Sequence, residues 1–431
     1  MLMLKLKVLL LACCVLLPLS VIAQTQDIIL WHSMAGQLGE ELERLAQEFN
    51  HSQTAYRVKP VYKGDYMESL TSFAAAFRAK NPPNLIQVFE VGTSVMRSPR
   101  GIIKPVEILM REQGVAISKE QFFPAVLKHY SLDGVLMAMP FNVSVPVLFY
   151  NADALAKIGV TQASFPKTWN ELERLAPRIQ QTGFSCVYTT AYPAWILIES
   201  YQALQGISPT EESSSSQLKA HLERIRLWQT KHFFEYGGRG DDATALFTSG
   251  KCPLFSQSSG AYEGLSKLVK FNLAVAPLPF DDTHHSSRHN NVVGGAALWV
   301  PAGQSSEMEH GIALYLDFIS QPRVQQSWYQ NTGYLPMVKD YQSSTSPIFD
   351  IAKMDLNHQN KSKCNQQQGA DNQIRTIHDQ MLEAIFSGMM SVEKAMNKAN
   401  NRIRHALTRF RKNTEAGVET SSQNGSESIS D

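Results

Sequence analysis

Residues 136–151 have the sequence LMAMPFNVSVPVLFYN, and this stretch decides the fold. It is apolar and rich in strand-forming residues, but it contains Pro140 and Pro146. Because proline has no backbone N–H, it is excluded from the middle of a sheet. We therefore predict that the chain leaves one sheet and enters another between Pro140 and Pro146. The lone hydroxyl of the stretch, Ser144, is expected to face the gap between two lobes.

The residues before this stretch alternate between strand and helix patterns. Strands are predicted at Asp27–His32, Tyr56–Tyr62 and Leu85–Phe89, with helices at Gly36–Asn50 and Tyr66–Lys80 between them. Such alternation is typical of a parallel sheet, in which ligands bind at the carboxyl ends of the strands. The segments at those ends contain Trp31-His32-Ser33, Tyr62-Lys63-Gly64-Asp65-Tyr66 and Glu90.

A second α/β alternation follows, with further crossings between lobes predicted near Leu278-Pro279 and at Asn331–Pro336. A chain of 431 residues is too long to fold around one ordinary hydrophobic core, so two domains are expected. We predict an N-terminal lobe from residues 24–138 and about 278–332. A C-terminal lobe is predicted from about 139–277 and 333–411, followed by a disordered tail at 412–431. Three crossings predict hinged lobes with a ligand cleft between them.

The N-terminus has the pattern of a signal peptide. Lys5 and Lys7 precede the apolar run Val8–Ile22, and cleavage is expected after about Ala23. A lipoprotein signal at Leu11-Ala12-Cys13 is the alternative. The 40 basic and 39 acidic residues give no general attraction to nucleic acid or anionic lipid, so no nucleic-acid partner is expected.

Three cysteines follow the predicted cleavage site, and export to an oxidising compartment favours one disulfide. Cys186 and Cys252 each lie in a strand-like context, whereas Cys364 lies in a Lys/Asn/Gln-rich segment. We predict a Cys186–Cys252 disulfide. The cysteine spacings match no zinc or redox motif, and neither a metal nor a cofactor is expected.

The sequence contains no catalytic signature: it has no nucleophile elbow, Walker loop or dinucleotide fingerprint. Taken alone, Arg375 fits a solvated helix, Tyr334 fits a core and Gly295 fits close packing. Glu90, at the carboxyl end of a strand, fits a binding site as well as it fits packing. The histidine-rich segment after Asp281 fits a solvated loop better than a metal site.

Several strings, taken together, resemble the extracellular solute-binding proteins of ABC importers, and among them the periplasmic receptors for sn-glycerol-3-phosphate. The resemblance covers about residues 27–410. It is carried by Trp31-His32-Ser33-Met34, Tyr62-Lys63-Gly64-Asp65-Tyr66, Pro140-Phe141-Asn142-x-Ser144, Pro166-x-Thr168-Trp169, Gly333-Tyr334-Leu335-Pro336 and Gln373-Ile374-Arg375. It implies a type II periplasmic binding protein-like α/β fold, a binding role without catalysis, and an inner-membrane ABC permease as partner of a monomeric receptor.

The resemblance also implies a ligand-binding set, in which all seven positions keep the family's residue type. The set is Tyr66, Glu90, Ser144, Ser258, Gly295, Tyr334 and Arg375, with Trp195 as a possible further contact. The planar fork of Arg375 suits phosphate oxygens, and the hydroxyls can donate to the same group. The Glu90 carboxylate can only accept hydrogen bonds, so it suits the glycerol hydroxyls.

Two departures from the family pattern bear on the ligand. Tyr192 stands where the family has a tryptophan, and Asp371 adds a carboxylate near Arg375. If Asp371 faced the cleft, it would weaken phosphate binding or favour a cationic ligand such as glycerophosphocholine. A maltodextrin receptor of the same fold and a glycerophosphodiester hydrolase are the alternative functions.

Overall fold

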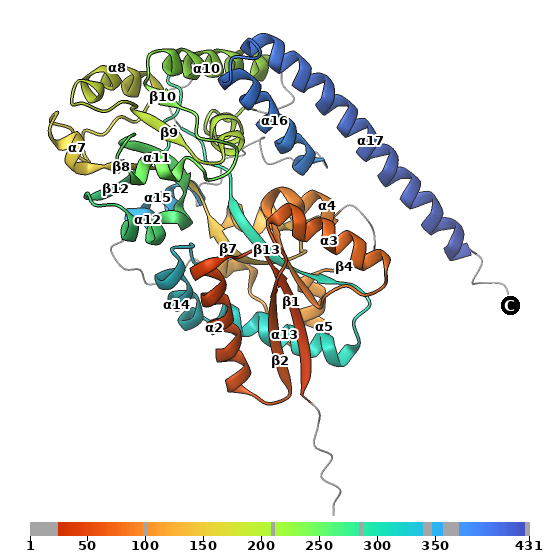
Figure 1. The fold of residues 1–431 in the computed structure, drawn as a ribbon. Coiled ribbons are helices and arrows are strands. Elements are labelled where there is room, and N and C mark those ends of the chain that lie inside the picture. Colours follow the sequence, from red (N-terminus) through yellow and green to blue (C-terminus); the bar gives the residue numbers. More distant parts are fainter. Residues whose placement is uncertain are drawn as a thin grey trace, which may run out of the picture.

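The computed structural model describes residues 25–97, 101–207, 212–283, 288–338, 347–356 and 370–426. In these ranges the chain forms two lobes, each built on one sheet with helices packed around it (Figure 1). No helix among the described residues has both the length and the apolar character of a membrane span. The predicted signal peptide at residues 1–23 and Cys364 lie outside these ranges.

The first lobe contains a sheet in the order β2-β1-β3-β13-β4, with β7 paired to β13. As predicted, the first three strands are parallel, whereas β13 runs antiparallel to β3, β4 and β7. The strands are β1 (Gln26–His32), β2 (Tyr56–Tyr62), β3 (Leu85–Phe89), β4 (Ile103–Lys104), β7 (Met139–Ser144) and β13 (Gly294–Pro301). The helices are α2 (Gly36–Ser52), α3 (Tyr66–Arg78), α4 (Thr93–Arg97), α5 (Val106–Glu112), α6 (Pro124–Tyr130), α13 (Ser306–Ser320) and α14 (Pro322–Thr332).

The second lobe contains a sheet in the order β10-β9-β11-β8-β12. Its strands are β8 (Pro146–Asn151), β9 (Tyr188–Thr190), β10 (Phe234–Glu235), β11 (Leu254–Ser258) and β12 (Leu273–Pro277). Its helices are α7 (Ala152–Ala156), α8 (Trp169–Gln180), the π-helix η3 (Trp195–Ser200), α9 (Tyr201–Leu204), α10 (Glu212–Thr230), α11 (Thr244–Thr248), α12 (Tyr262–Leu268), α16 (Asp371–Phe386) and α17 (Val392–Ser426). One further helix, α15 (Pro347–Leu356), contacts both β12 of this lobe and α6 of the first.

The opening stretch crosses between the sheets as predicted. β7 belongs to the first sheet and β8 to the second, and only Val145 separates them. Pro140 is tolerated because the β7–β13 pairing shifts register beside it, and Pro146 is the first residue of its strand. Val145 donates its N–H to Ser259 Oγ (3.1 Å) and accepts from the Ser259 N–H (2.8 Å), which holds the crossing to the second lobe.

Strand pairing moves two of the predicted lobe boundaries. Residues 139–144 were assigned to the C-terminal lobe, but β7 pairs with β13 of the first sheet, so the crossing lies at Val145. Similarly, Phe280 still bridges to Thr168 in the second lobe, so the return to the first sheet comes between Phe280 and Gly294 rather than at residue 278. The apolar pattern did not locate the first boundary because β7 and β8 are both buried along their whole length.

The C-terminal helix corrects a third prediction. α17 continues through Ser426, although a disordered tail was expected from residue 412. Residues 412–426 contain no proline to end the helix, and composition alone did not predict that it would continue. In Figure 1, α17 starts on the second lobe and descends beside the first.

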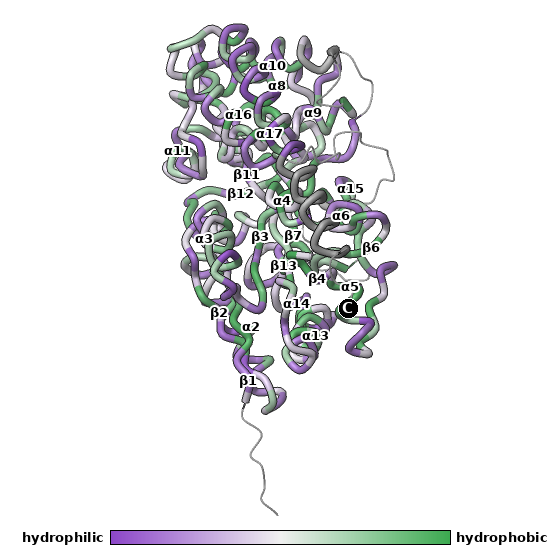
Figure 2. Tube along the Cα trace, turned by 90° about the vertical axis from the view of Figure 1, so that its right-hand side faces the viewer, coloured by the Kyte–Doolittle hydropathy of each residue, from purple (hydrophilic) through white to green (hydrophobic). Residues whose placement is uncertain are grey.

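Hydrophobic residues are frequent on the strands, whereas the outer helices carry many hydrophilic residues (Figure 2). The predicted disulfide is present: Cys186 and Cys252, both buried, precede the paired strands β9 and β11. It links two segments that are 66 residues apart in the sequence.

Candidate ligand-binding site

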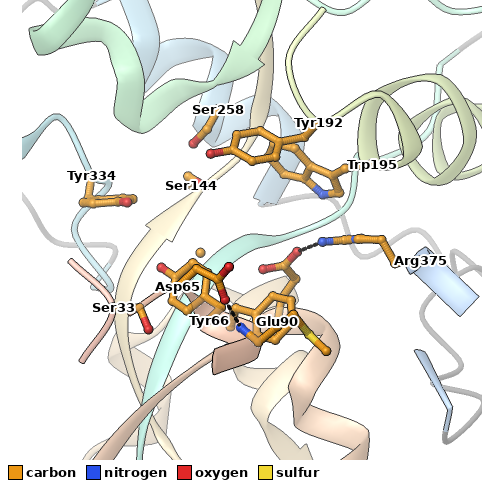
Figure 3. A pocket seen from close by; sticks show the side chains of 13 residues that line it. Ser33, Asp65, Tyr66, Glu90, Ser144, Tyr192, Trp195, Ser258, Tyr334 and Arg375 are labelled. Carbon is orange, nitrogen blue, oxygen red and sulfur yellow. Dashed lines mark hydrogen bonds and ion pairs between the residues drawn. The ribbon is translucent and has the colours of Figure 1, made fainter. Parts of the chain in front are cut away.

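A cavity of about 400 Å³ lies where the two lobes meet. All seven residues of the predicted set, together with Trp195, line it (Figure 3). The full lining consists of Ser33, Asp65, Tyr66, Met67, Phe89, Glu90, Ser144, Tyr192, Trp195, Ser258, Gly295, Tyr334 and Arg375. The structure therefore brings together residues that are as much as 342 positions apart in the sequence, Ser33 and Arg375.

The first lobe contributes the carboxyl ends of its parallel strands, as the sequence predicts. Ser33 follows β1, Tyr66 begins α3 after β2, and Glu90 follows β3. The ring of Tyr66 stacks on Phe89 with centroids 5.1 Å apart. Asp65 also lines the cavity, but its carboxylate caps α3 by accepting from the N–H groups of residues 67 and 68. Its position is thus explained by the helix start.

A buried amide network behind this wall was missed by the sequence analysis. Asn142, in β7, accepts a hydrogen bond from Gln87 Nε2 (2.9 Å) and donates to the Tyr66 hydroxyl (3.2 Å). Gln87 in turn accepts from the Ser33 N–H at 2.9 Å. Because Asn142 and Gln87 are almost fully buried, each must satisfy its polar groups internally. The network therefore fixes the position of the Tyr66 hydroxyl at the cavity wall.

Two glycines let neighbouring groups pack closely at the cavity: the Asn142 backbone packs against Gly295 and the Tyr334 ring packs against Gly260. Gly295 has φ +99°, and a Cβ there would lie 1.7 Å from the backbone oxygen of Asn142. Gly260, beside Ser258, packs under Tyr334, whose ring would lie 2.8 Å from a Cβ. Gly295 belongs to the predicted set through the family resemblance, and the geometry gives the physical reason that only glycine fits.

Arg375 is held by two carboxylates. Its Nε and Nη2 donate to the two oxygens of Glu199 at 2.8 and 2.5 Å, and its Nη1 donates to Glu90 at 2.6 Å. Burial lowers the pKa of Arg375, but the two carboxylates outweigh it and the net shift is upward, so the guanidinium stays charged. For Glu90, burial raises the pKa more than Arg375 lowers it.

Glu199 and Tyr192 are site residues that the predicted set did not include. Glu199 lies in the π-helix η3, one turn after Trp195, and such helices recur at functional sites. The available signal was one charge within the otherwise apolar run WILIES at residues 195–200. Tyr192 has φ +44°, an uncommon conformation for a bulky residue, and lies on the second-lobe side of the cavity (Figure 3).

Two partly buried histidines lie close enough to Arg375 for its charge to act on them. Burial lowers the pKa of His129 and of His378 to about 4, so both are neutral at pH 7. Asp371, the expected departure near Arg375, does not line the cavity. Its charge acts on Arg97. Burial lowers the pKa of Arg97, and Asp371 opposes that shift without reversing it. The concern that Asp371 faces the ligand is therefore not supported.

Only one group of three potential metal ligands was found among the described residues: Cys186, Glu235 and Cys252. Both sulfur atoms belong to the disulfide, so no thiolate is available there.

The fold and cavity define a two-lobed binding protein, and comparison with known proteins gives its family. A family model described as bacterial extracellular solute-binding protein matches residues 44–352. The chain belongs to this family, and it is a solute-binding protein rather than an enzyme. It is similar to the sn-glycerol-3-phosphate-binding periplasmic protein UgpB of Escherichia coli, with 34% identity over 90% of this chain and 93% of that protein. The Salmonella typhimurium protein of the same name is 35% identical over 89% of this chain and 92% of its own length.

Solved structures show the same type II fold. UgpB from Mycobacterium tuberculosis in complex with glycerophosphocholine matches with a TM-score of 0.75 and 20% identity, covering 89% of this chain and 99% of that one. Maltose-bound MalE3 of T. maritima matches with a TM-score of 0.72 and 16% identity, covering 88% of this chain and 100% of that one. At these identities the matches concern the fold alone.

Proposed function

We propose that this protein captures sn-glycerol-3-phosphate in the periplasm and delivers it to an inner-membrane ABC permease, and that it also accepts glycerophosphodiesters such as glycerophosphocholine. The observation that carries the proposal is that one cavity contains Arg375 and hydroxyl groups from both lobes. The names and extent of the two enterobacterial relatives support the same ligand class. Export with cleavage after about Ala23 and a monomeric state are part of the proposal.

The chemistry of the cavity suits a phosphate monoester that carries a diol. Arg375 uses three of its five N–H groups on Glu199 and Glu90, and the Nη1 now paired with Glu90 can turn to a phosphate oxygen. The hydroxyls of Ser144, Ser258, Tyr66 and Tyr334 can donate to the same group. A released Glu90 can accept from glycerol hydroxyls, and it keeps acceptor capacity when it is protonated.

The cavity places polar groups of both lobes around one space. Glu90 and Tyr66 belong to the first lobe, whereas Ser258 and Arg375 belong to the second. Ser144 lies at the crossing itself, one residue before Val145. A ligand that contacts both sides stabilises the closed arrangement by its differential affinity for it.

A maltodextrin receptor is the second candidate, because one observation favours it. Tyr66, Phe89, Tyr192, Trp195 and Tyr334 give the cavity several aromatic faces on which sugar rings can stack. Against it, a neutral sugar that opened the Glu90–Arg375 pair would bring no negative charge to Nη1 and no positive charge to Glu90, and only Glu199 would still pair with the arginine.

Calorimetric titration with sn-glycerol-3-phosphate, glycerophosphocholine and maltose separates these candidates. We expect both phosphate ligands to bind and maltose to give no heat. Arg375→Ala should remove most of the affinity for glycerol-3-phosphate, since loss of a buried charged partner costs about 2–5 kcal/mol. Undiminished affinity in that variant, or binding of maltose alone, would refute the proposal.

A further inference from the structure

The lining of the ligand cavity has no excess of positive charge that would attract an anionic ligand. The lining contains two acidic residues, Asp65 and Glu90, and one basic residue, Arg375, so its formal charge is −1. The whole chain has a formal charge of only +1. Neither the cavity nor the molecule as a whole therefore attracts an anion from solution, although the proposed ligand is a phosphate ester.

A strong local source of positive charge lies beside the cavity, on α17. Residues 392–412 contain seven lysines and arginines but one acid, Glu393. Six exposed residues of this segment recur at intervals of three or four and so share one face of the helix. They are Lys394, Lys398, Arg402, His405, Arg409 and Lys412, and we call them the α17 stripe.

A second cavity, of about 320 Å³, lies between part of the stripe and α16, next to the ligand cavity. Arg402, His405 and Arg409 line it from α17, and Asn372, Gln373, Thr376 and Ile377 line it from α16, the helix that carries Arg375. Met67 lines this cavity and also the ligand cavity, so the two are neighbours. No acidic residue lines the second cavity, and Arg402 is positioned by donating to Gln380 of α16 at 2.6 Å.

We propose that the α17 stripe is an outer anion site that draws the phosphate group of the ligand to the mouth of the cleft, from which it passes Met67 to reach Arg375. The inference rests on the proposed function. Clustered charge of one sign raises the rate of association of an opposite charge by roughly 10–10³-fold, and salt suppresses the effect. Because Arg402 and Arg409 lie outside the ligand cavity, they act on the association rate far more than on the dissociation rate.

The test is stopped-flow binding of sn-glycerol-3-phosphate to the chain carrying Arg402→Gln and Arg409→Gln together. Arg404→Gln is the matched control, because Arg404 lies on another face of α17, lines neither cavity and is likewise exposed. Tryptophan fluorescence reports binding, since Trp195 lines the ligand cavity. Rates are compared at salt concentrations of about 0.01 M and about 1 M, where the Debye length is roughly 30 Å and roughly 3 Å.

At low salt we expect the double variant to associate about tenfold more slowly than the unaltered chain, with an unchanged dissociation rate. At high salt the difference should vanish, and Arg404→Gln should have little effect at either concentration. An association rate that the double variant leaves unchanged, or that Arg404→Gln lowers equally, would overturn the proposal. Absence of any binding by the unaltered chain would instead refute the proposed function, and this inference with it.

Discussion

Glu90 and Arg375 form an ion pair of 2.6 Å across the cleft, although Glu90 follows β3 of the first lobe and Arg375 lies on α16 of the second. Glu199, which belongs to the same lobe as Arg375, occupies the Nε–Nη2 edge of the guanidinium. An anionic ligand that reaches Arg375 therefore competes with Glu90 for Nη1, while Glu199 can keep the arginine in place. In the proposed cycle, the carboxylate of Glu90 holds the position that the phosphate later takes.

Ligand binding should be accompanied by proton uptake at Glu90. Burial already raises the pKa of this carboxyl, and Arg375 opposes that rise. When phosphate takes over Arg375 and adds its own negative charge, the pKa of Glu90 must rise further. The phosphate of the ligand, whose second pKa is about 6, can also exchange a proton on binding. Titration calorimetry of glycerol-3-phosphate at pH 6, in two buffers with different ionisation enthalpies, should therefore show a proton uptake that exceeds that of a variant without a carboxyl at residue 90 by up to about one proton per ligand.

Glu90→Gln is the control for this linkage, because it keeps the side-chain shape and cannot titrate. In this variant only the proton exchange of the phosphate and of other groups remains, so the uptake per ligand should be lower by up to about one proton. If the two proteins show the same proton uptake, Glu90 does not exchange partners as proposed.

Gly295→Ala should destabilise the fold severely. The residue has φ +99°, and the added Cβ would lie 1.7 Å from the Asn142 oxygen, which is backbone and cannot rotate away. Gly303 is a matched control with φ +88° and no atom within 4 Å of a Cβ. Its alanine variant carries only the conformational cost of about 1–2 kcal/mol. Urea unfolding should show a loss for Gly295→Ala that exceeds this control by several-fold, and equal losses would contradict the contact.

The crossing could be predicted from sequence because proline has a fixed chemical deficit. Pro140 and Pro146 each lack a backbone N–H, so neither suits the middle of a continuous strand. A change of sheet between them was therefore expected. The exact point could not be predicted, since residues on both sides of Val145 are equally buried and only pairing with β13 assigns β7 to the first sheet. Periodicity reports burial but not the partner strand.

The candidate site divides in the same way. Glu90 and Tyr66 could be placed from the ends of predicted parallel strands, whereas Arg375 entered only through the family resemblance. Glu199 was missed because its partner is 176 residues away, and a helical pattern gives no sign of that contact. Asn142 was missed within the very stretch that decides the fold, since its two hydrogen-bond partners belong to other elements.

Loss of the Cys186–Cys252 disulfide should lower stability without changing ligand affinity. The bond closes a 66-residue segment, for which chain entropy gives a stabilisation of roughly 4 kcal/mol. Neither cysteine lines the ligand cavity. We expect the Cys186→Ala/Cys252→Ala double variant to unfold at lower urea but to bind glycerol-3-phosphate as the unaltered chain does. A changed affinity with unchanged stability would reverse this assignment.

Stability should fall below neutral pH because buried histidines are held neutral, and His221 offers the sharpest test. It is fully buried against the rings of Tyr201 and Trp169, and burial lowers its pKa to about 3. In the unfolded chain its pKa is about 6.5. The favourable contribution is complete above pH 6.5 and is lost as pH falls toward 3, since only the unfolded state binds the proton.

At pH 5 this one group should lower the free energy of unfolding by roughly 2 kcal/mol relative to pH 7. His221→Phe keeps an aromatic ring between Tyr201 and Trp169 but cannot titrate. We expect its urea midpoint to change less between pH 7 and pH 5 than that of the unaltered chain. His129, whose pKa is also low, remains in both proteins and cancels in the comparison. An identical pH dependence for the two proteins would mean that His221 is protonated, or hydrated, in the folded state.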